Sequence, residues 1–136
     1  MENLHQTIIN LESLAEMYFD DGKFDEHLDL WDKSEVQFES PFGNFYEADS
    51  YINWLKEFYD YTQNLGGTRH FVLNPVVIHV DDMVEFKGYL YIINKQNGSF
   101  MGTSVMHDRF KFINGEWKFV YGSVSPDQDL SNLGSK

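Results

Sequence analysis

Apolar residues in the first half of the chain recur with the spacing of α-helices. Near the N-terminus they form one helical stripe that consists of Leu4, Ile8, Leu11, Leu14, Ala15 and Tyr18. This stripe predicts a first helix that ends near Gly22, because glycine terminates helices readily. A short second helix is predicted over residues 24–31, with Phe24, Leu28 and Trp31 on one side.

A third helix is predicted over residues 51–65, "YINWLKEFYDYTQNL", with Asp49 or Ser50 as its N-cap and a glycine pair after its end. Its apolar face is wide, as expected for a helix that lies across a sheet. The face consists of Tyr51, Trp54, Leu55, Phe58, Tyr61, Thr62 and Leu65. The aromatic residues Trp54 and Phe58 are therefore expected in the core and in the wall of any ligand pocket.

From residue 68 onward the spacing of apolar residues changes to two, the period of β-strands. The predicted segments are a short strand over 36–40, a turn or irregular link over 41–45, and long strands over 69–80, 83–95, 99–113 and 116–124. Helices followed by an antiparallel meander indicate an α+β fold with the helices on one face of the sheet. We expect one domain over residues 1–126 and a polar C-terminal tail over residues 127–136.

Composition excludes several classes of function. The chain carries 22 acidic and 10 basic residues, a net charge of −12, so we expect no nucleic-acid partner. It shows no signal peptide or apolar span, and we expect a soluble cytoplasmic protein without a membrane partner. Cysteine is absent and no histidine pair has metal-ligand spacing, so we expect no metal and no other cofactor. Aromatic residues make up 17% of the chain, enough to fill a core and line a cavity.

Alternation along the strands assigns each side chain to one face of the sheet. Asp108 interrupts a row of apolar residues that should face the helices. Burial would raise its pKa, so Asp108 is a candidate acid or base, or else a structural partner of Arg69 or another polar neighbour. The other polar groups expected in a pocket are Ser104, Asn94 and Tyr121.

Arg69 and His70 stand where the third helix ends and the first long strand begins. His70 is either a catalytic or ligand-orienting group at the rim of a pocket, or a packed histidine without a chemical role. We expect His27 on a helix surface. His79 should face outward, unless a bulge at Pro75 resets the register of the strand.

Three segments, "YFDDGKFDEHLDLW", "TRHFVLN" and "HDRFKFINGEWKF", resemble the SnoaL-like branch of the nuclear-transport-factor-2-like superfamily in order and spacing. The resemblance covers about residues 4–126. It implies a cone in which a strongly bent antiparallel sheet wraps around three N-terminal helices and leaves a deep apolar pocket. Members commonly form homodimers through the convex sheet face, which suits the outward Tyr89 and Tyr91.

Within this superfamily the motifs are most similar to those of scytalone dehydratase and the bile-acid dehydratases. The resemblance places Asp20, or Asp21 in another register, at a pocket aspartate, His70 at the histidine paired with it, and Ser104 at a substrate-contacting serine. It also shows departures: Ala15 or Glu16 stands where a catalytic tyrosine is found, Asn94 replaces a second histidine, and Met106 replaces a pocket asparagine.

An aspartate within hydrogen-bond reach of His70 would fix the tautomer of the imidazole and stabilise the imidazolium. Such a pair could remove a proton α to a carbonyl and return one to a leaving hydroxyl without a cofactor. The hypothesis is a protein that binds a small apolar or aromatic molecule, with His70, Asp20 and Asp108 as candidates for dehydratase, isomerase or cyclase chemistry. The alternative is a non-catalytic ligand-binding or assembly domain of the same fold, and the residues leave this choice open.

Overall fold

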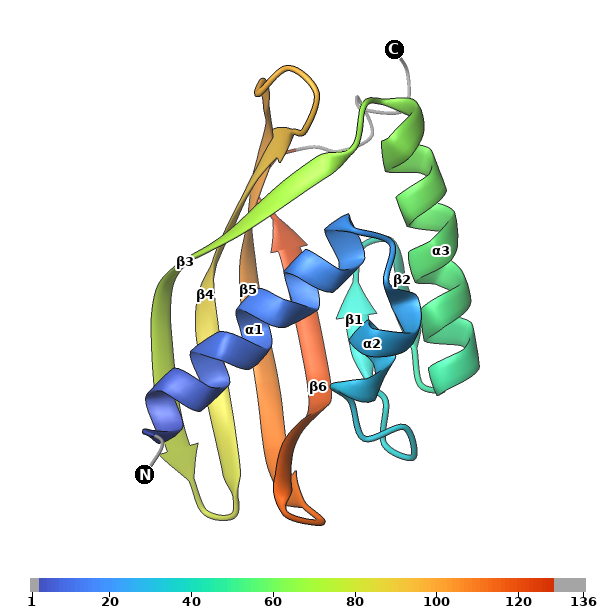
Figure 1. The fold of residues 1–136 in the computed structure, drawn as a ribbon. Coiled ribbons are helices and arrows are strands. Elements are labelled where there is room, and N and C mark those ends of the chain that lie inside the picture. The colour runs from blue at the N-terminus through green and yellow to red at the C-terminus, as the bar shows by residue number, and fades with distance from the viewer. Residues whose placement is uncertain (1–2, 129–136) are drawn as a thin grey trace.

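The computed structural model describes residues 3–128 as three helices on one bent six-stranded sheet (Figure 1). The helices are α1 (Leu4–Asp20), α2 (Phe24–Asp29) and α3 (Ala48–Asn64). The strands are β1 (Phe38–Ser40), β2 (Gly43–Phe45), β3 (Thr68–Val80), β4 (Met83–Asn94), β5 (Phe100–Ile113) and β6 (Glu116–Pro126). The predicted α+β architecture is confirmed.

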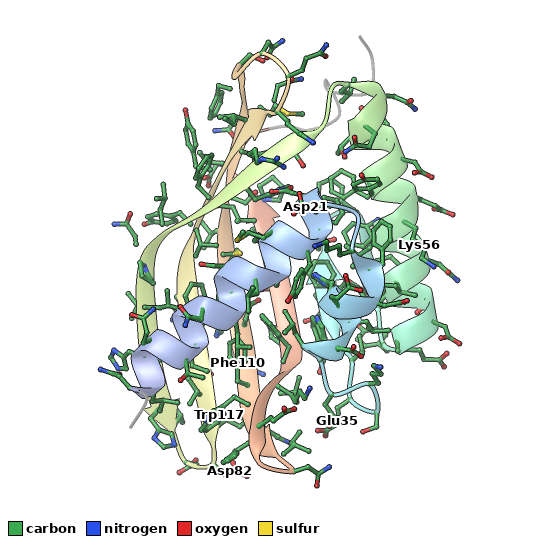
Figure 2. The ribbon with its side chains drawn as sticks, viewed as in Figure 1. Asp21, Glu35, Lys56, Asp82, Phe110 and Trp117 are labelled. Atoms are coloured by element: carbon green, nitrogen blue, oxygen red, sulfur yellow. The ribbon has the colours of Figure 1, made fainter. Side chains whose placement is uncertain are left out.

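The sheet has the order β2-β1-β6-β5-β4-β3, and every neighbouring pair is antiparallel except β1 and β6. Helix α1 runs across the concave face of β3 to β6, and α3 stands beside the short strands (Figure 1). The inner face of the sheet packs against α1. Ile8 of α1 and Phe86 and Phe110 of the sheet belong to one core cluster and are fully buried; Phe110 is labelled in Figure 2. No helix among residues 3–128 is long and apolar enough to cross a membrane.

Two local predictions for the helical half are wrong. Helix α3 begins at Ala48, and Glu47 occupies its N-cap position, so neither Asp49 nor Ser50 caps it. The segment predicted as a turn or irregular link contains strand β2. This strand follows a tight turn in which the Ser40 hydroxyl accepts the Phe42 N–H at 3.1 Å, a contact that apolar periodicity does not reveal.

A β-bulge in β3 changes which of its side chains face inward. In β3 the register shifts between Leu73 and Val76, and Asn74 adopts a positive φ of 54°. This shift confirms the conditional prediction of a bulge at Pro75, and it pairs His79 with the buried Val84.

The tail begins as an extension of the sheet. The Asp127 N–H donates to the Thr103 carbonyl at 2.9 Å, and the Gln128 side chain accepts the Thr103 N–H at 2.8 Å. The first two residues of the predicted tail are therefore held against β5. The rest of the predicted tail, residues 129–136, lies outside the described residues.

Candidate active site

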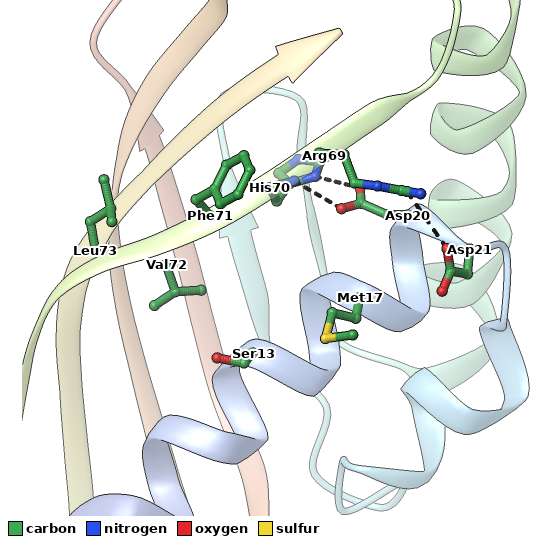
Figure 3. A pocket seen from close by; sticks show the side chains of 9 residues that line it. All are labelled: Ser13, Met17, Asp20, Asp21, Arg69, His70, Phe71, Val72 and Leu73. Atoms are coloured by element: carbon green, nitrogen blue, oxygen red, sulfur yellow. Dashed lines mark hydrogen bonds and ion pairs between the residues drawn. The ribbon is translucent and has the colours of Figure 1, made fainter. Parts of the chain in front are cut away.

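The end of α1 and the start of β3 bring Asp20 and His70 together. Oδ1 of Asp20 lies 2.6 Å from His70 Nδ1, and Oδ2 accepts the backbone N–H of His70 at 2.8 Å (Figure 3). The Thr68 hydroxyl donates to Oδ1 at 2.8 Å. Asp20 is only 4% exposed, so these three hydrogen bonds replace the water that its carboxylate loses on folding.

The alternative pocket aspartate, Asp21, is in a different position. It is the exposed C-cap residue of α1, and its Oδ1 lies 3.6 Å from the guanidinium of Arg69 (Figure 3). The structure thus brings Asp20 to His70 and leaves Asp21 at the surface. Among the described residues, Arg69 pairs with Asp21 and forms no ion pair with Asp108.

The hydrogen bond to Asp20 determines which ring nitrogen of His70 carries the proton. A buried carboxylate accepts, so Nδ1 carries the proton and Nε2 keeps its lone pair; Nε2 has no hydrogen-bond partner among residues 3–128. Burial by itself would lower the pKa of His70, but the carboxylates of Glu16 and Asp20 outweigh it and raise the pKa above its ordinary value. The imidazole can therefore take up a proton at Nε2 near neutral pH.

His70 also lines a cavity of about 110 Å³ between α1, α2, α3 and the concave face of the sheet. Six aromatic residues form much of its wall: Phe19, Phe38, Phe42, Tyr51, Trp54 and Phe58. Its other polar residues are Glu16, His27, His70 and Ser104. The predicted positions of His70, Ser104, Trp54 and Phe58 in the wall of one cavity agree with the structure, while their roles toward a ligand stay predictions.

A second hollow lies on the outer side of the same pair. It is a groove of about 450 Å³ between α1 and β3, and Met17, Phe71 and Leu73 form its apolar side (Figure 3). His70 borders both the groove and the inner cavity. The Asp20–His70 pair therefore lies between the inner cavity and the groove.

Sequence reasoning missed Glu16 as a member of the site. Its Oε2 lies 3.9 Å from His70 Nδ1, and its side chain is 20% exposed. Burial, together with the charges of Asp20 and Asp108, raises the pKa of Glu16 to about 7 against the opposing effect of His70. Glu12, Glu16 and Asp20 recur every four residues, the spacing that places side chains on one helix face, and this acidic row was a signal in the sequence.

His27 is buried, so the prediction of a surface position is wrong. Its Nδ1 donates to the Ala15 carbonyl at 2.9 Å, and its Nε2 accepts the Tyr51 hydroxyl at 2.9 Å. Burial lowers the pKa of His27 to about 4, and it raises the pKa of Tyr51 well above its ordinary value. The pair forms a neutral polar part of the cavity wall.

Asp108 does not line the cavity. It lies beneath α1, 6% exposed, and hydrogen bonds to Glu12, which is 2% exposed. Burial raises the pKa of Asp108 to about 6, against the opposing hydrogen bonds from Glu12 and the Ser123 backbone. The hydrogen bond between them raises the pKa of Glu12 and lowers that of Asp108, so Glu12 is the donor. Gly122 leaves the necessary room, since a Cβ there would lie 3.2 Å from Asp108 Oδ1.

Three other residues predicted to lie in the pocket, Asn94, Met106 and Tyr121, do not line the cavity. Asn94 holds the turn after β4, where its Nδ2 donates to the Leu65 carbonyl at 2.7 Å. Met106 is buried in the core outside the cavity wall.

The predicted inward orientation of Tyr121 is wrong. A register shift opposite Phe110 makes Val120 the extra residue of a bulge and turns Tyr121 to the convex face. There its hydroxyl donates to Glu39 at 2.8 Å, and the Arg109 guanidinium lies 4.7 Å from its ring.

Comparison with protein families identifies the family of this domain. The model of the SnoaL-like domain matches residues 4–121. The chain belongs to the SnoaL-like domain family. A search of curated proteins found no match.

Solved structures share the fold of this SnoaL-like domain at low identity. An NTF2-like protein with a cystatin-like fold from Novosphingobium aromaticivorans is 14% identical, with a TM-score of 0.78 over 95% of this chain and 86% of that chain. A protein from Catenulispora acidiphila in complex with S-DNPA is 15% identical, with a TM-score of 0.79 over 98% of each chain. A protein named as a candidate scytalone dehydratase, also from N. aromaticivorans, is 15% identical, with a TM-score of 0.74 over 90% of this chain and 83% of that chain. The expected NTF2-like fold is thus confirmed.

Proposed function

We propose that this SnoaL-like domain is a cofactor-independent lyase or isomerase that acts on a small apolar or aromatic molecule. The observation that carries the proposal is the Asp20–His70 pair, joined at 2.6 Å and bordering an aromatic cavity. The SnoaL-like family assignment and the neighbour bound to S-DNPA support a small-molecule site in this fold. Function is argued from the site, because proteins with this fold need not share an activity.

The proton transfers follow from the protonation states of the site. Nε2 of His70 takes a proton from the carbon next to a substrate carbonyl, and Asp20 stabilises the imidazolium through Nδ1. In a dehydration, the electron pair of the broken C–H bond forms the C=C bond while the hydroxyl departs as water. The departing oxygen receives its proton from Glu16 or from the imidazolium. In an isomerisation, the same proton returns to another carbon of the enolate.

Replacing His70 by alanine tests this proposal. A thermal-shift screen of small hydroxylated ketones and enones first identifies ligands, and absorbance of the conjugated product then measures their turnover. We expect His70→Ala to lower kcat/KM by about 10²- to 10⁴-fold, since the variant lacks its general base. His79→Ala is the matched control, because His79 is an exposed histidine of the same strand, and it should keep the wild-type rate.

The same screen distinguishes the non-catalytic alternative. Ligands that stabilise the protein but are never turned over would indicate a binding domain. Turnover that survives in His70→Ala within threefold of wild type would contradict the assignment of the base.

We also propose that the domain forms a homodimer through its convex sheet face. Exposed apolar residues gather there: Phe71, Leu73, Val76, Ile78, Tyr89, Tyr91 and Val105. Monomeric proteins seldom expose so many apolar side chains on one face.

A charge on this face is expected to separate the two subunits. Tyr91→Lys would place an unpaired ammonium in the interface, and sedimentation equilibrium should show at least a tenfold higher dissociation constant. Tyr61→Lys, on the exposed side of α3, should leave the dissociation constant unchanged. A monomeric wild-type protein at 100 µM or so would rule out this interface.

A further inference from the structure

The ionisable groups around the cavity are mostly acidic. Its lining includes Glu16 but no lysine or arginine among the described residues. Arg69 points to the outer groove, where it pairs with Asp21. The titratable groups that surround Glu16 are Glu12 and Asp20 from α1, His27 from α2, Tyr51 from α3, His70 from β3 and Asp108 from β5. His70 is the single group of this set that gains a positive charge near neutral pH, and Asp20 already pairs with it.

The cavity is also small. Its volume is about 110 Å³, whereas ligand pockets typically measure roughly 300–1,000 Å³. An engineered apolar cavity of about 150 Å³ in another protein holds benzene. The rings of its wall pack against one another: the Trp54 centroid lies 5.5 Å from that of Phe58 and 5.4 Å from that of Phe38. A single ring therefore matches the volume better than two fused rings do.

We infer that the cavity selects an uncharged, single-ring ligand that carries a hydroxyl or carbonyl group, and that Glu16 excludes carboxylates. This inference rests on the proposed function only in taking the cavity as the ligand site. A bound carboxylate would lose its water and face Glu16 with no lysine or arginine in the lining to pair with, so both desolvation and repulsion oppose it. A neutral hydroxyl can instead donate to Glu16 or to His70 Nε2. The flat aromatic wall packs against the ring.

Three probes of related shape test the inference at pH 8: 4-methylphenol, 4-methylbenzoate and 2-naphthol. Binding is followed by ¹H–¹⁵N NMR titration, so that shifts of Ser104 and Ile92 report occupation of the cavity. We expect 4-methylphenol to bind at least tenfold more tightly than either of the other probes. Equal affinity for 4-methylbenzoate would overturn the charge rule, and equal affinity for 2-naphthol would overturn the size rule.

The variant Glu16→Gln tests the residue itself. It should raise the affinity for 4-methylbenzoate at least tenfold and change that for 4-methylphenol by less than threefold, because only the anion loses a repulsive neighbour. Glu57→Gln, at an exposed position on α3, removes one negative charge away from the cavity and should change neither affinity. An unchanged preference in Glu16→Gln would overturn the assignment to Glu16.

A pH titration of the wild-type protein gives a second test that needs no substitution. Glu16 has a pKa of about 7, so at pH 5.5 it is mostly neutral, while 4-methylbenzoate is still ionised. The affinity for 4-methylbenzoate should therefore rise between pH 8 and pH 5.5, and a flat profile would contradict the inference. Binding with the expected preference but without any effect of His70→Ala on turnover would refute the proposed activity and leave this inference standing.

Discussion

Replacing Asp20 by alanine is expected to destabilise the protein by about 3 kcal/mol or more. The carboxylate accepts hydrogen bonds from the Thr68 hydroxyl and from two groups of His70, and these donors would stay buried without partners. Urea denaturation at pH 7 measures the loss of stability. Asp21→Ala is the control, because Asp21 is exposed and its ion pair with Arg69 should contribute less than about 1 kcal/mol.

The isosteric variant Asp20→Asn separates the chemical role of Asp20 from its structural role. Its amide oxygen can still accept the His70 backbone N–H, while its NH₂ group then faces Nδ1. Nδ1 must become an acceptor, and the proton moves to Nε2, so the base required by the proposed reaction is lost. Side-chain ¹⁵N NMR should show the Nδ1–H tautomer in the wild type and the Nε2–H tautomer in the variant. The same tautomer in both would mean that Asp20 does not control the imidazole.

The second large effect concerns the buried pair Glu12 and Asp108. Burial, and then the neighbouring carboxylate of Asp108, raise the pKa of Glu12 well above its ordinary value. The folded state therefore keeps a proton that the unfolded state releases, and stability falls as the pH rises from about 4.5 through the folded pKa of Glu12. Glu12→Gln supplies a neutral side chain of the same size and removes this loss.

We expect Glu12→Gln to stabilise the protein by on the order of 2 kcal/mol at pH 8 and to have little effect at pH 4, since one pKa unit corresponds to about 1.4 kcal/mol. Denaturation curves at both pH values measure the difference. Glu26→Gln, at an exposed position on α2, should show no pH-dependent gain. If Glu12→Gln gave the same change at both pH values, Glu12 would not hold a proton in the folded protein.

His27 contributes a pH dependence of the opposite sign. Its pKa is lowered to about 4, so the unfolded state binds a proton first as the pH falls from about 6.5. Stability is then lost toward acid, whereas the raised pKa values of Glu16 and Asp108 lose stability toward neutral pH. Between about pH 4.5 and 6.5 the two effects on stability therefore oppose each other.

Local periodicity was enough to predict most of the elements and the faces of the long strands. A helix repeats every 3.6 residues and a strand every two, so the apolar row of β5, with Ser104 and Asp108 in it, could be assigned inward from neighbouring residues alone. The prediction failed for Tyr121 because one bulge residue, Val120, inverts the alternation. It failed for His27 because a helix of six residues is too short for its pattern to separate a buried side from an exposed one.

For the candidate site, the resemblance to SnoaL-like proteins supplied Asp20 and His70 as partners across 50 positions of the chain. Spacing within one helix could have added Glu16, because Glu12, Glu16 and Asp20 share a face of α1. Spacing could not show that Asn94 and Met106 lie outside the cavity. Inward parity brings a side chain into the concave side of the sheet, but it does not distinguish the packed core or a turn from the cavity.

The sequence by itself determined the order of the helices and long strands, the acidic charge and the inward parity of Ser104 and Asp108, since these depend on composition and on neighbours a few residues away. Only the tertiary structure decided that Asp20 rather than Asp21 reaches His70, that Asp108 pairs with Glu12 outside the cavity, and that the cavity is about 110 Å³. The physical reason is the path of α1 across β3 to β6. The angle and depth of that crossing depend on the packing of many side chains at once, and no local pattern encodes them.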